Sequence, residues 1–480
     1  MDEHIQVFTE GGLDLTGETG KTSAFMTSYS ITTDGEGNPL FGDEFVGSAY
    51  NPELINILRV DHEYDGVLVT DWGVTNDNAN EVGYDFSYMG PSYGMEDKTV
   101  EERHFYALVA GIDMFGGNND KAPVLAAYEM WQEAHENGEL EQSAEERFRT
   151  SAKRIVRNFF NVGIFEDPYL DLEESKAIVA SQDKVEAGYQ AQLDSVVMLK
   201  NKNETIRPSE DLSEYKDMIV YIPSTMRTPH DSIFGPGQPF SGPTMDVAVA
   251  ENYFKEVRTD TEILDDEGNV IGFEAPELDD VDLVIVGMTS PDNGGNFSFA
   301  GIEEDGETYY PMSLQYRPYT ADGPNVRKES IAGDILEDGT KENRSYFGNT
   351  SKISNEYDLD AVLNAVEAVE ESGKDIPVVV AMKAKNPVVM AEFEDKVDAI
   401  VVGFQVSDNA LFDIILGAQE PQGLLPLQYP KDMDTVEAQY EDVARDMEPY
   451  VDSEGNSYDY GFGLNYNGVI QDERTEKYVD

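Results

Sequence analysis

The chain has 480 residues, of which 40% are hydrophobic, and this length and composition predict two or three folded domains rather than one. It carries 33 Lys and Arg against 96 Asp and Glu, which gives a formal net charge of −63. A surface of this charge repels phosphate backbones and anionic membranes, so nucleic-acid binding and membrane association are disfavoured. Because the acidic residues are spread along the whole chain, we interpret them as a solubilising surface suited to high ionic strength; a site that attracts cations is the alternative.

Several classes of site are excluded or disfavoured by what the sequence lacks. It contains no cysteine, which excludes disulfides and thiolate chemistry. No cluster of His and Glu has the spacing of metal ligands, so we expect neither a metal nor another cofactor. The start, Met1 to His4, has neither the basic nor the apolar region of a signal peptide, and no segment approaches the length of a membrane span. We therefore expect no membrane insertion by this chain, and its compartment stays open.

In the first 165 residues the expected elements alternate between strand and helix. Runs of β-formers predict the strands, and apolar residues three and four apart predict the helices. Residues 1–20 are polar and contain one weak helical segment at most. The expected elements then follow in this order: strand 24–29, a helix from Asn51-Pro52, strand 67–70, helix 99–110, strand 110–114 and helices within 121–160.

Local signals mark the starts and the buried faces of these helices. Thr99 opens the helix at 99–110, and Ser143 with Glu146 forms a plausible capping box. Apolar side chains at helical spacing mark the faces that we expect to be buried. They are Leu54, Ile57 and Leu58 in the first helix, and Phe148, Ala152, Ile155, Val156 and Phe159 in the last.

The second part of the chain has the pattern of a layered α/β domain. Four apolar runs predict buried strands, at 218–222, 283–286, 378–381 and 399–402. A helix is expected at 182–195 before them and another at 358–371 among them. Strands that alternate with helices at this spacing indicate an α/β sandwich with a mostly parallel sheet.

One stretch, Asp65-Gly66-Val67-Leu68-Val69-Thr70-Asp71-Trp72-Gly73, organises the functional interpretation. It predicts a buried parallel strand that ends in a carboxylate, an aromatic residue and a glycine. The carboxyl ends of such strands are where barrel enzymes keep their chemistry, so Asp71 is a candidate catalytic residue. The alternative is that Asp71 only caps the following helix.

With its flanking motifs, this stretch resembles the glycoside hydrolases of family 3, in which a TDWG-like tetrapeptide carries the catalytic nucleophile. The resemblance covers roughly residues 15 to 470, and several motifs together make it specific. The matching segments are Phe25 to Tyr29, Asn51 to Arg59, Thr70 to Gly73, Ala110 to Met114, Arg154 to Arg157, Val162 to Phe165, Val197 to Asn201, Gly423 to Pro426 and Tyr460 to Leu464.

The resemblance implies an α/β fold in which an incomplete (β/α)8 barrel half is followed by a mostly parallel α/β sandwich domain. The expected domains are the barrel part with the nucleophile (1–165), a linker and a helix (166–209), the sandwich (210–470) and an acidic tail (471–480). A closed barrel of this type needs eight strands, and only about the last three precede residue 120. A second chain that supplies the rest of the barrel, or a homo-oligomer, is therefore an expected partner.

The resemblance also implies two catalytic carboxyl groups. Asp71 matches the nucleophile. The general acid/base of many family members follows a strand of the second domain, and Asp292 stands at the matching place after strand 283–286. Glu303 and Glu304, further along the same loop, are the alternatives. A loop that is merely acidic and solvated explains these residues as well.

Four more residues are expected to shape the substrate pocket. By the family pattern, Tyr29 donates a hydrogen bond to the nucleophile, and Asp113 and Met114 lie at the end of the last strand. Trp72 offers an apolar face to a sugar ring, although packing at the barrel rim explains it equally well.

The expected activity is that of a retaining exo-β-glycosidase, most simply a β-glucosidase acting on an oligosaccharide or glycoside in carbohydrate catabolism. A β-xylosidase or β-N-acetylhexosaminidase is an alternative, because the residues that recognise the sugar belong largely to the missing barrel half. A non-catalytic or partner-dependent fragment is the alternative from a different class.

Overall fold

The computed structural model of the protein describes residues 2–34, 37–77, 92–232, 235–294, 301–302, 308–331, 333, 340–440, 443 and 445–476. The chain forms two compact units, Met1–Ile178 and Val179–Asp480, which we call the N-terminal unit and the C-terminal unit. The domain boundaries expected from the sequence stay a prediction.

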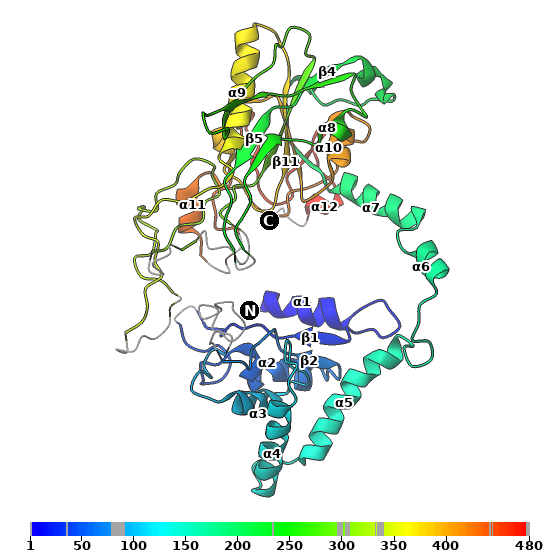
Figure 1. Ribbon diagram of the computed structural model, residues 1–480, viewed down its shortest axis with the longest axis vertical. Helices are drawn as coiled ribbons and strands as arrows, with labels where there is room; N and C mark the ends of the chain where they lie inside the picture. The colour runs from blue at the N-terminus through cyan, green and yellow to red at the C-terminus, as the bar shows by residue number, and fades with distance from the viewer. Residues whose placement is uncertain are drawn as a thin grey trace. The chain divides into compact units, whose positions relative to one another are not determined.

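A pair of short parallel strands organises the N-terminal unit (Figure 1). β1 (Ala24–Met26) pairs with β2 (Val67–Val69) along its whole length. The third expected strand, at 110–114, is reduced to one parallel bridge between Val69 and Met114. The β-formers around Leu68 therefore do form the predicted strand, and this leucine is buried in the core of the unit.

The helix expected after Asn51 is shorter than predicted and changes type. The Asn51 side chain accepts the Leu54 N–H and so caps α2 (Pro52–Asn56), which continues into one turn of π-helix, η2 (Ile57–Asp61). The buried face also differs from the expected one. Ile55 is the buried residue, whereas Leu54, Ile57 and Leu58 are only half-buried.

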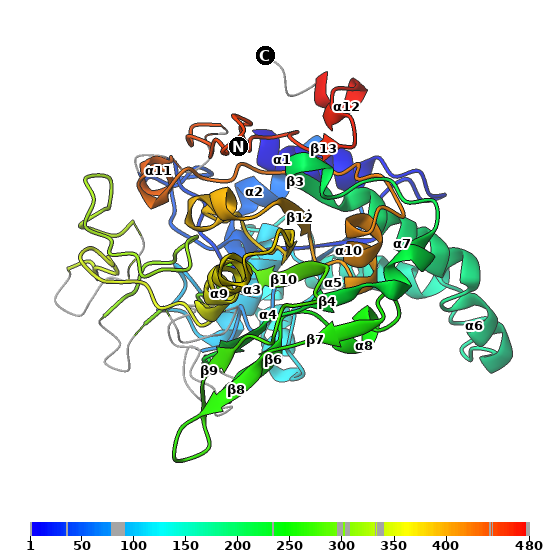
Figure 2. The same cartoon turned by 90° about the horizontal axis from the view of Figure 1, so that it is seen from above.

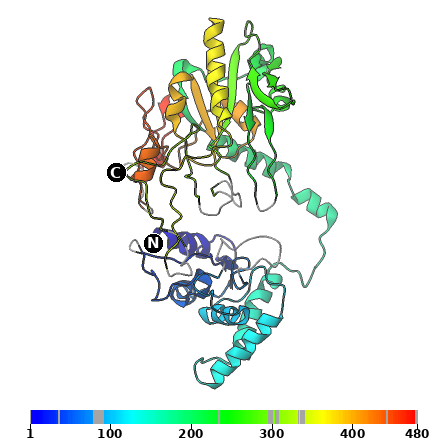
Figure 3. The ribbon, with the colours of Figure 1, turned by 60° about the vertical axis from the view of Figure 1, so that its left-hand side comes forward.

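Three further helices of this unit follow β2. α3 (Val100–Ala110) and α5 (Ala144–Asn161) both begin with a capping box, which confirms the signals at Thr99 and Ser143. α4 (Ala122–Glu136) packs against both of them (Figure 3). The helical segment 121–160 is therefore two helices.

The apolar face predicted for the last of these helices is only partly buried. Phe148 and Ile155 of α5 are half-buried, whereas Ala152, Val156 and Phe159 are exposed. The fully buried residues of the helix are Ala144, Arg147 and Ser151. The prediction was wrong for the three exposed residues because periodicity shows which residues share a face but not what that face contacts.

An eight-stranded mixed sheet forms the centre of the C-terminal unit, with the order β14-β13-β3-β12-β11-β10-β4-β7. The four strands expected from apolar runs are confirmed and lie next to one another as a parallel block. They are β4 (Ile219–Tyr221), β10 (Leu283–Thr289), β11 (Val378–Lys383) and β12 (Ala399–Gly403).

The sheet is larger and less parallel than the sequence predicted. β7 (Glu256–Arg258) extends the parallel block at one edge. At the other edge β3 (Val197–Asn201), β13 (Leu464–Asn465) and β14 (Gly468–Val469) pair antiparallel. The segment 166–209, expected to hold a linker and a helix, thus also supplies a strand of the sheet.

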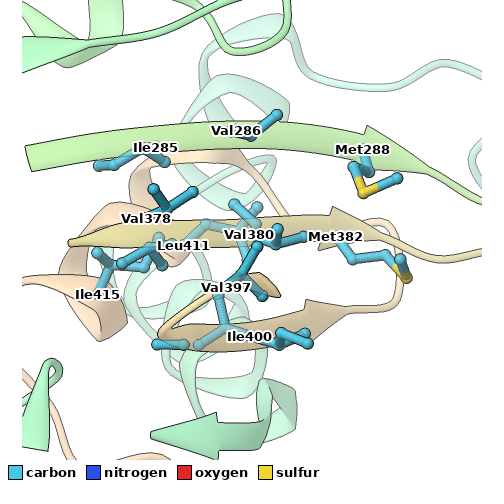
Figure 4. Packing of buried hydrophobic residues seen from close by; sticks show 14 of the residues in the cluster. Ile285, Val286, Met288, Val378, Val380, Met382, Val397, Ile400, Leu411 and Ile415 are labelled. Carbon is cyan, nitrogen blue, oxygen red and sulfur yellow. The ribbon is translucent and has the colours of Figure 1, made fainter. Parts of the chain in front are cut away.

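Helices cover both faces of this sheet. Figure 2 shows α9 (Tyr357–Ser372) on one face, and α8 (Val247–Ala250) and α10 (Asp408–Ile415) on the other. Side chains in register on neighbouring strands form the core beneath them, such as Val380 of β11 beside Ile400 of β12 (Figure 4). Full burial of each such side chain contributes roughly 1.5–3 kcal/mol.

One ion pair is buried in this core. Lys200 of β3 lies 2.6 Å from Glu394, and both side chains are almost wholly inaccessible. The ammonium also donates to the Ser453 hydroxyl at 3.2 Å, so β3 is joined to the segment near the C-terminus. The charge of Lys200, which directly follows the apolar run 197–199, is therefore compensated.

The remaining elements are shorter or peripheral. They are α1 (Asp2–Leu13), η1 (Ser48–Tyr50), α6 (Leu172–Ile178), α7 (Gln182–Ser195), η4 (Lys202–Glu204), η5 (Leu212–Asp217), β5 (Ser224–Arg227), β6 (Phe240–Pro243), β8 (Thr261–Leu264), β9 (Val270–Glu274), η6 (Met390–Glu392), η7 (Glu394–Lys396), α11 (Met433–Ala438) and α12 (Glu473–Glu476). α7 confirms the helix predicted at 182–195. Among the described residues, none of the helices combines the length and apolarity that crossing a bilayer requires.

Candidate active site

The loop after β2 is held by backbone contacts to the segment that follows α3. Thr70 is buried, and its N–H donates to the carbonyl oxygen of Met114 at 3.0 Å. Its hydroxyl accepts the N–H of Gly116 at 2.8 Å, and the N–H of Gly73 donates to the Gly116 carbonyl oxygen at 3.1 Å. The residues between Thr70 and Gly73 are thereby fixed at the carboxyl end of the strand.

Asp71 lies in the middle of this loop and is half-buried. One of its carboxylate oxygens accepts the N–H of Trp72 at 2.7 Å. The Tyr29 hydroxyl donates to the Trp72 carbonyl oxygen at 2.6 Å, so three of the expected site residues lie together. Burial, together with the nearby Asp71 carboxylate, raises the pKa of Tyr29 to about 12. Tyr29 therefore keeps its proton at neutral pH and remains a hydrogen-bond donor.

Two glycines that the sequence interpretation missed allow this close approach. A Cβ on Gly116 would lie 2.4 Å from the Thr70 carbonyl oxygen. Gly117 has φ +71°, and a Cβ there would lie 2.6 Å from the indole ring of Trp72. Larger residues are excluded at both positions. The Gly-Gly pair shortly after a predicted strand was the available signal.

Trp72 and Met114 are both open to a ligand within this unit. The Trp72 side chain is 72% exposed and that of Met114 is 47% exposed. Met114 is also joined to β2 by its bridge to Val69. Both residues therefore lie beside Asp71 with apolar surface that is free to contact a sugar ring.

Asp113 occupies a different environment from these residues. Its carboxylate is fully buried and accepts from Arg147 at 3.2 Å, from Arg154 at 3.1 Å and from the Ser151 hydroxyl at 2.7 Å. It also pairs with Arg59 and accepts the N–H of Leu68, in β2. The side chain has no exposed surface, and the substrate contact expected for Asp113 stays a prediction.

Three arginines around one carboxylate are the feature that sequence reasoning missed. Burial alone would raise the pKa of Asp113, but the charges of Arg59, Arg154 and Arg147, with the bond from Ser151, outweigh it and hold the pKa below its usual range. We call these five residues the Asp113 cluster. The arginines were the signal that the sequence offered for this cluster. A chain of net charge −63 contains few cations, and several of them lie around this one carboxylate.

Asp292 lies in the C-terminal unit, in the loop after β10. Its carboxylate accepts the N–H of Gly294 at 3.0 Å and the Ser354 hydroxyl at 3.0 Å, and its own N–H donates to Asn355 at 2.7 Å. Both carboxylate oxygens are thus bonded within its immediate surroundings. Glu303 and Glu304 lie outside the described residues.

Comparisons with known proteins identify the relatives of the chain. Residues 335–466 match the sequence model described as the glycosyl hydrolase family 3 C-terminal domain. A periplasmic beta-glucosidase/beta-xylosidase of Dickeya chrysanthemi is 24% identical over 470 residues, which are 96% of this chain and 54% of that protein. The probable beta-glucosidase C of Aspergillus flavus is 24% identical over 426 residues, 88% of this chain and 50% of that protein.

The fold agrees with these matches. The crystal structure of a beta-glucosidase from Listeria innocua in complex with isofagomine superposes with a TM-score of 0.53 at 16% identity, over 92% of this chain and 52% of that one. The resemblance to glycoside hydrolase family 3 is confirmed. The chain spans about half the length of the curated relatives it matches.

The Asp113 cluster leads to a testable prediction about the stability of this family 3-like chain. Replacing Asp113 by Asn leaves three largely buried arginines without their shared counter-charge. We expect the N-terminal unit to lose about 3–5 kcal/mol of unfolding free energy at pH 7, the usual cost of breaking a buried ion pair. Urea unfolding followed by tryptophan fluorescence measures this, because Trp72 and Trp131 both lie in this unit and are the only tryptophans of the chain.

The pH dependence provides the control for this variant. The folded pKa of Asp113 lies below the unfolded value of about 3.9, so its stabilisation is present above that pH and is lost as the pH falls through the folded value. Asp113→Asn should flatten this acid limb, whereas Asp61→Asn, at an exposed carboxylate of the same unit, should not. An unchanged acid limb in Asp113→Asn would contradict the assignment.

Proposed function

We propose that this chain carries the catalytic nucleophile of a retaining β-glycosidase, most simply a β-glucosidase that removes a terminal β-D-glucosyl residue. The observation that carries the proposal is the position of Asp71, half-buried at the carboxyl end of β2 with Tyr29 and Trp72 beside it. The resemblance to family 3 supports the same residue, because Thr70 to Gly73 match the TDWG-like tetrapeptide of that family.

In this mechanism the Asp71 carboxylate attacks the anomeric carbon, and the bond from that carbon to the leaving oxygen breaks. A carboxylic acid donates its proton to the leaving oxygen and then, as carboxylate, takes a proton from the water that hydrolyses the glycosyl–enzyme ester. Tyr29, which keeps its proton, supplies a neutral donor close to the nucleophile. Trp72 and Met114 supply apolar surface for the sugar.

The acid/base residue stays a prediction among Asp292, Glu303 and Glu304. The general acid must hold a proton and reach the leaving oxygen. Asp292 has both carboxylate oxygens hydrogen-bonded to Gly294 and Ser354, so it would have to release these bonds before it could act. These bonds are the reason to test Glu303 and Glu304 beside Asp292.

The specificity of the proposed enzyme has one supported alternative. The Dickeya relative is named for both glucosidase and xylosidase activity, so a β-xyloside is the second substrate that we propose to test.

We further propose that the N-terminal unit is the end of a (β/α)8 barrel. β1 pairs on one edge with β2, and among the described residues its other edge pairs with no strand. Met26 of β1 is 57% exposed, and Phe160 and Phe165 near the end of α5 are 56% and 57% exposed. An unpaired strand edge, together with exposed apolar side chains in the same unit, favours pairing with further βα units, on the same polypeptide or on another.

The first prediction of this proposal concerns Asp71. A 2-deoxy-2-fluoro-β-glucoside should label the Asp71 carboxylate covalently, and Asp71→Asn should lower kcat by several orders of magnitude. Peptide mass spectrometry locates the label, and Asp61→Asn, an exposed carboxylate in the same unit, is the matched control. A label on another residue would refute the assignment. The fluoro-xyloside tests the second substrate in the same way.

The second prediction separates the acid/base candidates. Replacing the true acid/base by Ala should largely preserve the formation of the glycosyl–enzyme from aryl glycosides with very acidic leaving groups. Added azide should then restore turnover by intercepting the glycosyl–enzyme. We expect azide rescue for Glu303→Ala or Glu304→Ala and none for Asp292→Ala. Rescue of Asp292→Ala alone would show that its loop bonds do open.

The third prediction tests the barrel. We expect the N-terminal unit of residues 1–480 alone to be more sensitive to limited proteolysis than the C-terminal unit, and aryl-glucoside turnover to be low. A polypeptide that carries the first five βα units of a family 3 barrel should increase both protection and turnover. Full activity together with equal protease resistance in the isolated chain would rule out the partner-dependent interpretation.

A further inference from the structure

Two neighbouring residues of α3, Arg103 and His104, reach the loop that follows β2. We call residues 70–77 the Asp71 loop. Both side chains are buried. The guanidinium of Arg103 donates to the carbonyl oxygen of Asn76 at 2.9 Å and pairs with the carboxylate of Asp77 at 2.8 Å. The end of the Asp71 loop is thereby held by α3.

The hydrogen bonds of His104 determine which of its ring nitrogens carries a proton. Nδ1 lies 2.7 Å from the carbonyl oxygen of Val100, which can only accept, so Nδ1 donates. Nε2 lies 2.7 Å from the side-chain nitrogen of Asn118. The side-chain oxygen of Asn118 already accepts the N–H of Asp120 at 2.9 Å, so the amide nitrogen is the atom that faces the ring. Because this nitrogen can only donate, Nε2 accepts, and His104 is neutral.

The imidazole of His104 joins the Asp71 loop to the segment that supports it. On the side of the loop, the hydroxyl of the buried Thr75 faces Nε2 at 3.4 Å. On the other side, Asn118 directly follows the Gly116-Gly117 pair, which packs closely against the loop. The ring of Phe115, which precedes that pair, has its centre 4.3 Å from the centre of the imidazole. One neutral side chain therefore contacts both segments.

Protonation of His104 would break this arrangement. Burial lowers the pKa of His104 below its usual value of about 6.5, although the carboxylates of Glu101 on α3 and Asp120 before α4 act in the opposite direction. The ring is therefore neutral at neutral pH and takes up a proton only in more acidic solution. A proton on Nε2 would turn the acceptor into a donor that points at the Asn118 amide, which is also a donor. Asn118 could keep this contact only by turning its amide over, and it would then lose the bond from Asp120.

We propose that His104 is a positioning residue for Asp71, which as a neutral imidazole fixes the Asp71 loop through Asn118 and Thr75 and on protonation releases it. His104 acts through these residues and takes no part in the bond changes. The consequence for catalysis rests on the proposed function, because it takes Asp71 as the nucleophile. The contacts that hold the loop belong to the N-terminal unit alone. The reaction should accordingly be lost in acid as His104 takes up its proton.

The test uses the full chain and a matched set of variants. His104→Gln keeps a neutral acceptor that can reach Asn118 but cannot titrate, whereas His104→Leu removes the acceptor. His62→Gln replaces an exposed histidine of the same unit and is the control. Nitrogen-15 NMR of the imidazole rings gives the tautomer and the folded pKa of His104, and its missing signal in His104→Gln provides the assignment. Near-UV circular dichroism checks that each variant is folded.

Hydrogen exchange, corrected for the intrinsic pH dependence of amide exchange, measures how firmly residues 70–77 and 113–118 are held. In the unsubstituted chain and in His62→Gln, protection of both segments should fall roughly tenfold as the pH falls through the folded pKa of His104, as expected for the loss of one buried hydrogen bond. His104→Gln should keep its protection over the same pH range. His104→Leu should show the lowered protection already at neutral pH.

The outcomes separate this proposal from the proposed function. A proton on Nε2 at neutral pH, loop protection that does not follow the titration of His104, or an unchanged pH dependence in His104→Gln would each overturn the positioning role. Labelling of Asp71 by the fluoroglucoside is measured separately, and its rate should show the same acid limb, which His104→Gln removes. If Asp71 is not labelled at all, the proposed nucleophile fails, and the exchange measurements still decide whether His104 holds the loop.

Discussion

The N-terminal unit depends on the burial of one carboxylate, Asp113, among three arginines. Removing a charge from water is costly, and in this case the cost is offset only because Arg59, Arg147 and Arg154 surround the carboxylate from different elements. Asp113 also accepts the N–H of Leu68, so η2, β2 and α5 are tied to a single point. The position of β2, which leads to Asp71, therefore depends on electrostatics as well as on its short pairing with β1. The proposed chemistry depends on that position.

The C-terminal unit is organised by apolar burial instead. Its central strands are buried on both faces, as parallel sheets covered by helices must be, and one internal ion pair joins the edge strand β3 to the segment near the C-terminus. The direction of the chain reverses between β4 and β10, which leaves the carboxyl edge concave. The loop that carries Asp292 follows β10 at this edge, and a cavity lined by Arg227, Thr289 and Lys383 lies there as well.

Because the chain has a net charge of −63, the contacts of each Lys and Arg show which carboxylates receive a counter-charge. Exposed ion pairs contribute little to stability and are screened by salt, whereas buried pairs are screened much less. Cations of the N-terminal unit that lie near β2 are concentrated on Asp113 and on Asp65, which Arg154 and Arg157 contact. High ionic strength should therefore relieve repulsion at the surface and leave the Asp113 cluster largely unaffected.

The sequence by itself determined the family resemblance, the central strands and several helix starts. Apolar runs such as 378–381, and capping residues such as Thr99, act through local geometry, which depends only on residues close together in the chain. The sequence also indicated Asp71, Trp72 and Tyr29 as candidate site residues, because they belong to motifs of the family. These parts required no knowledge of which segments meet in space.

Only the tertiary structure decided the surroundings of those residues. Most of the apolar stripe of α5 is exposed, and the side with Arg147 and Ser151 is buried, because that side meets a carboxylate 38 positions before Ser151 in the chain. For the same reason Asp113 lies at the centre of a buried ion cluster, which no local pattern predicted. β3 and β13 join the sheet through pairing with strands distant in sequence, which no local pattern encodes. Burial and pairing are properties of two segments at once, so the sequence predicts each segment while the fold alone determines its partner.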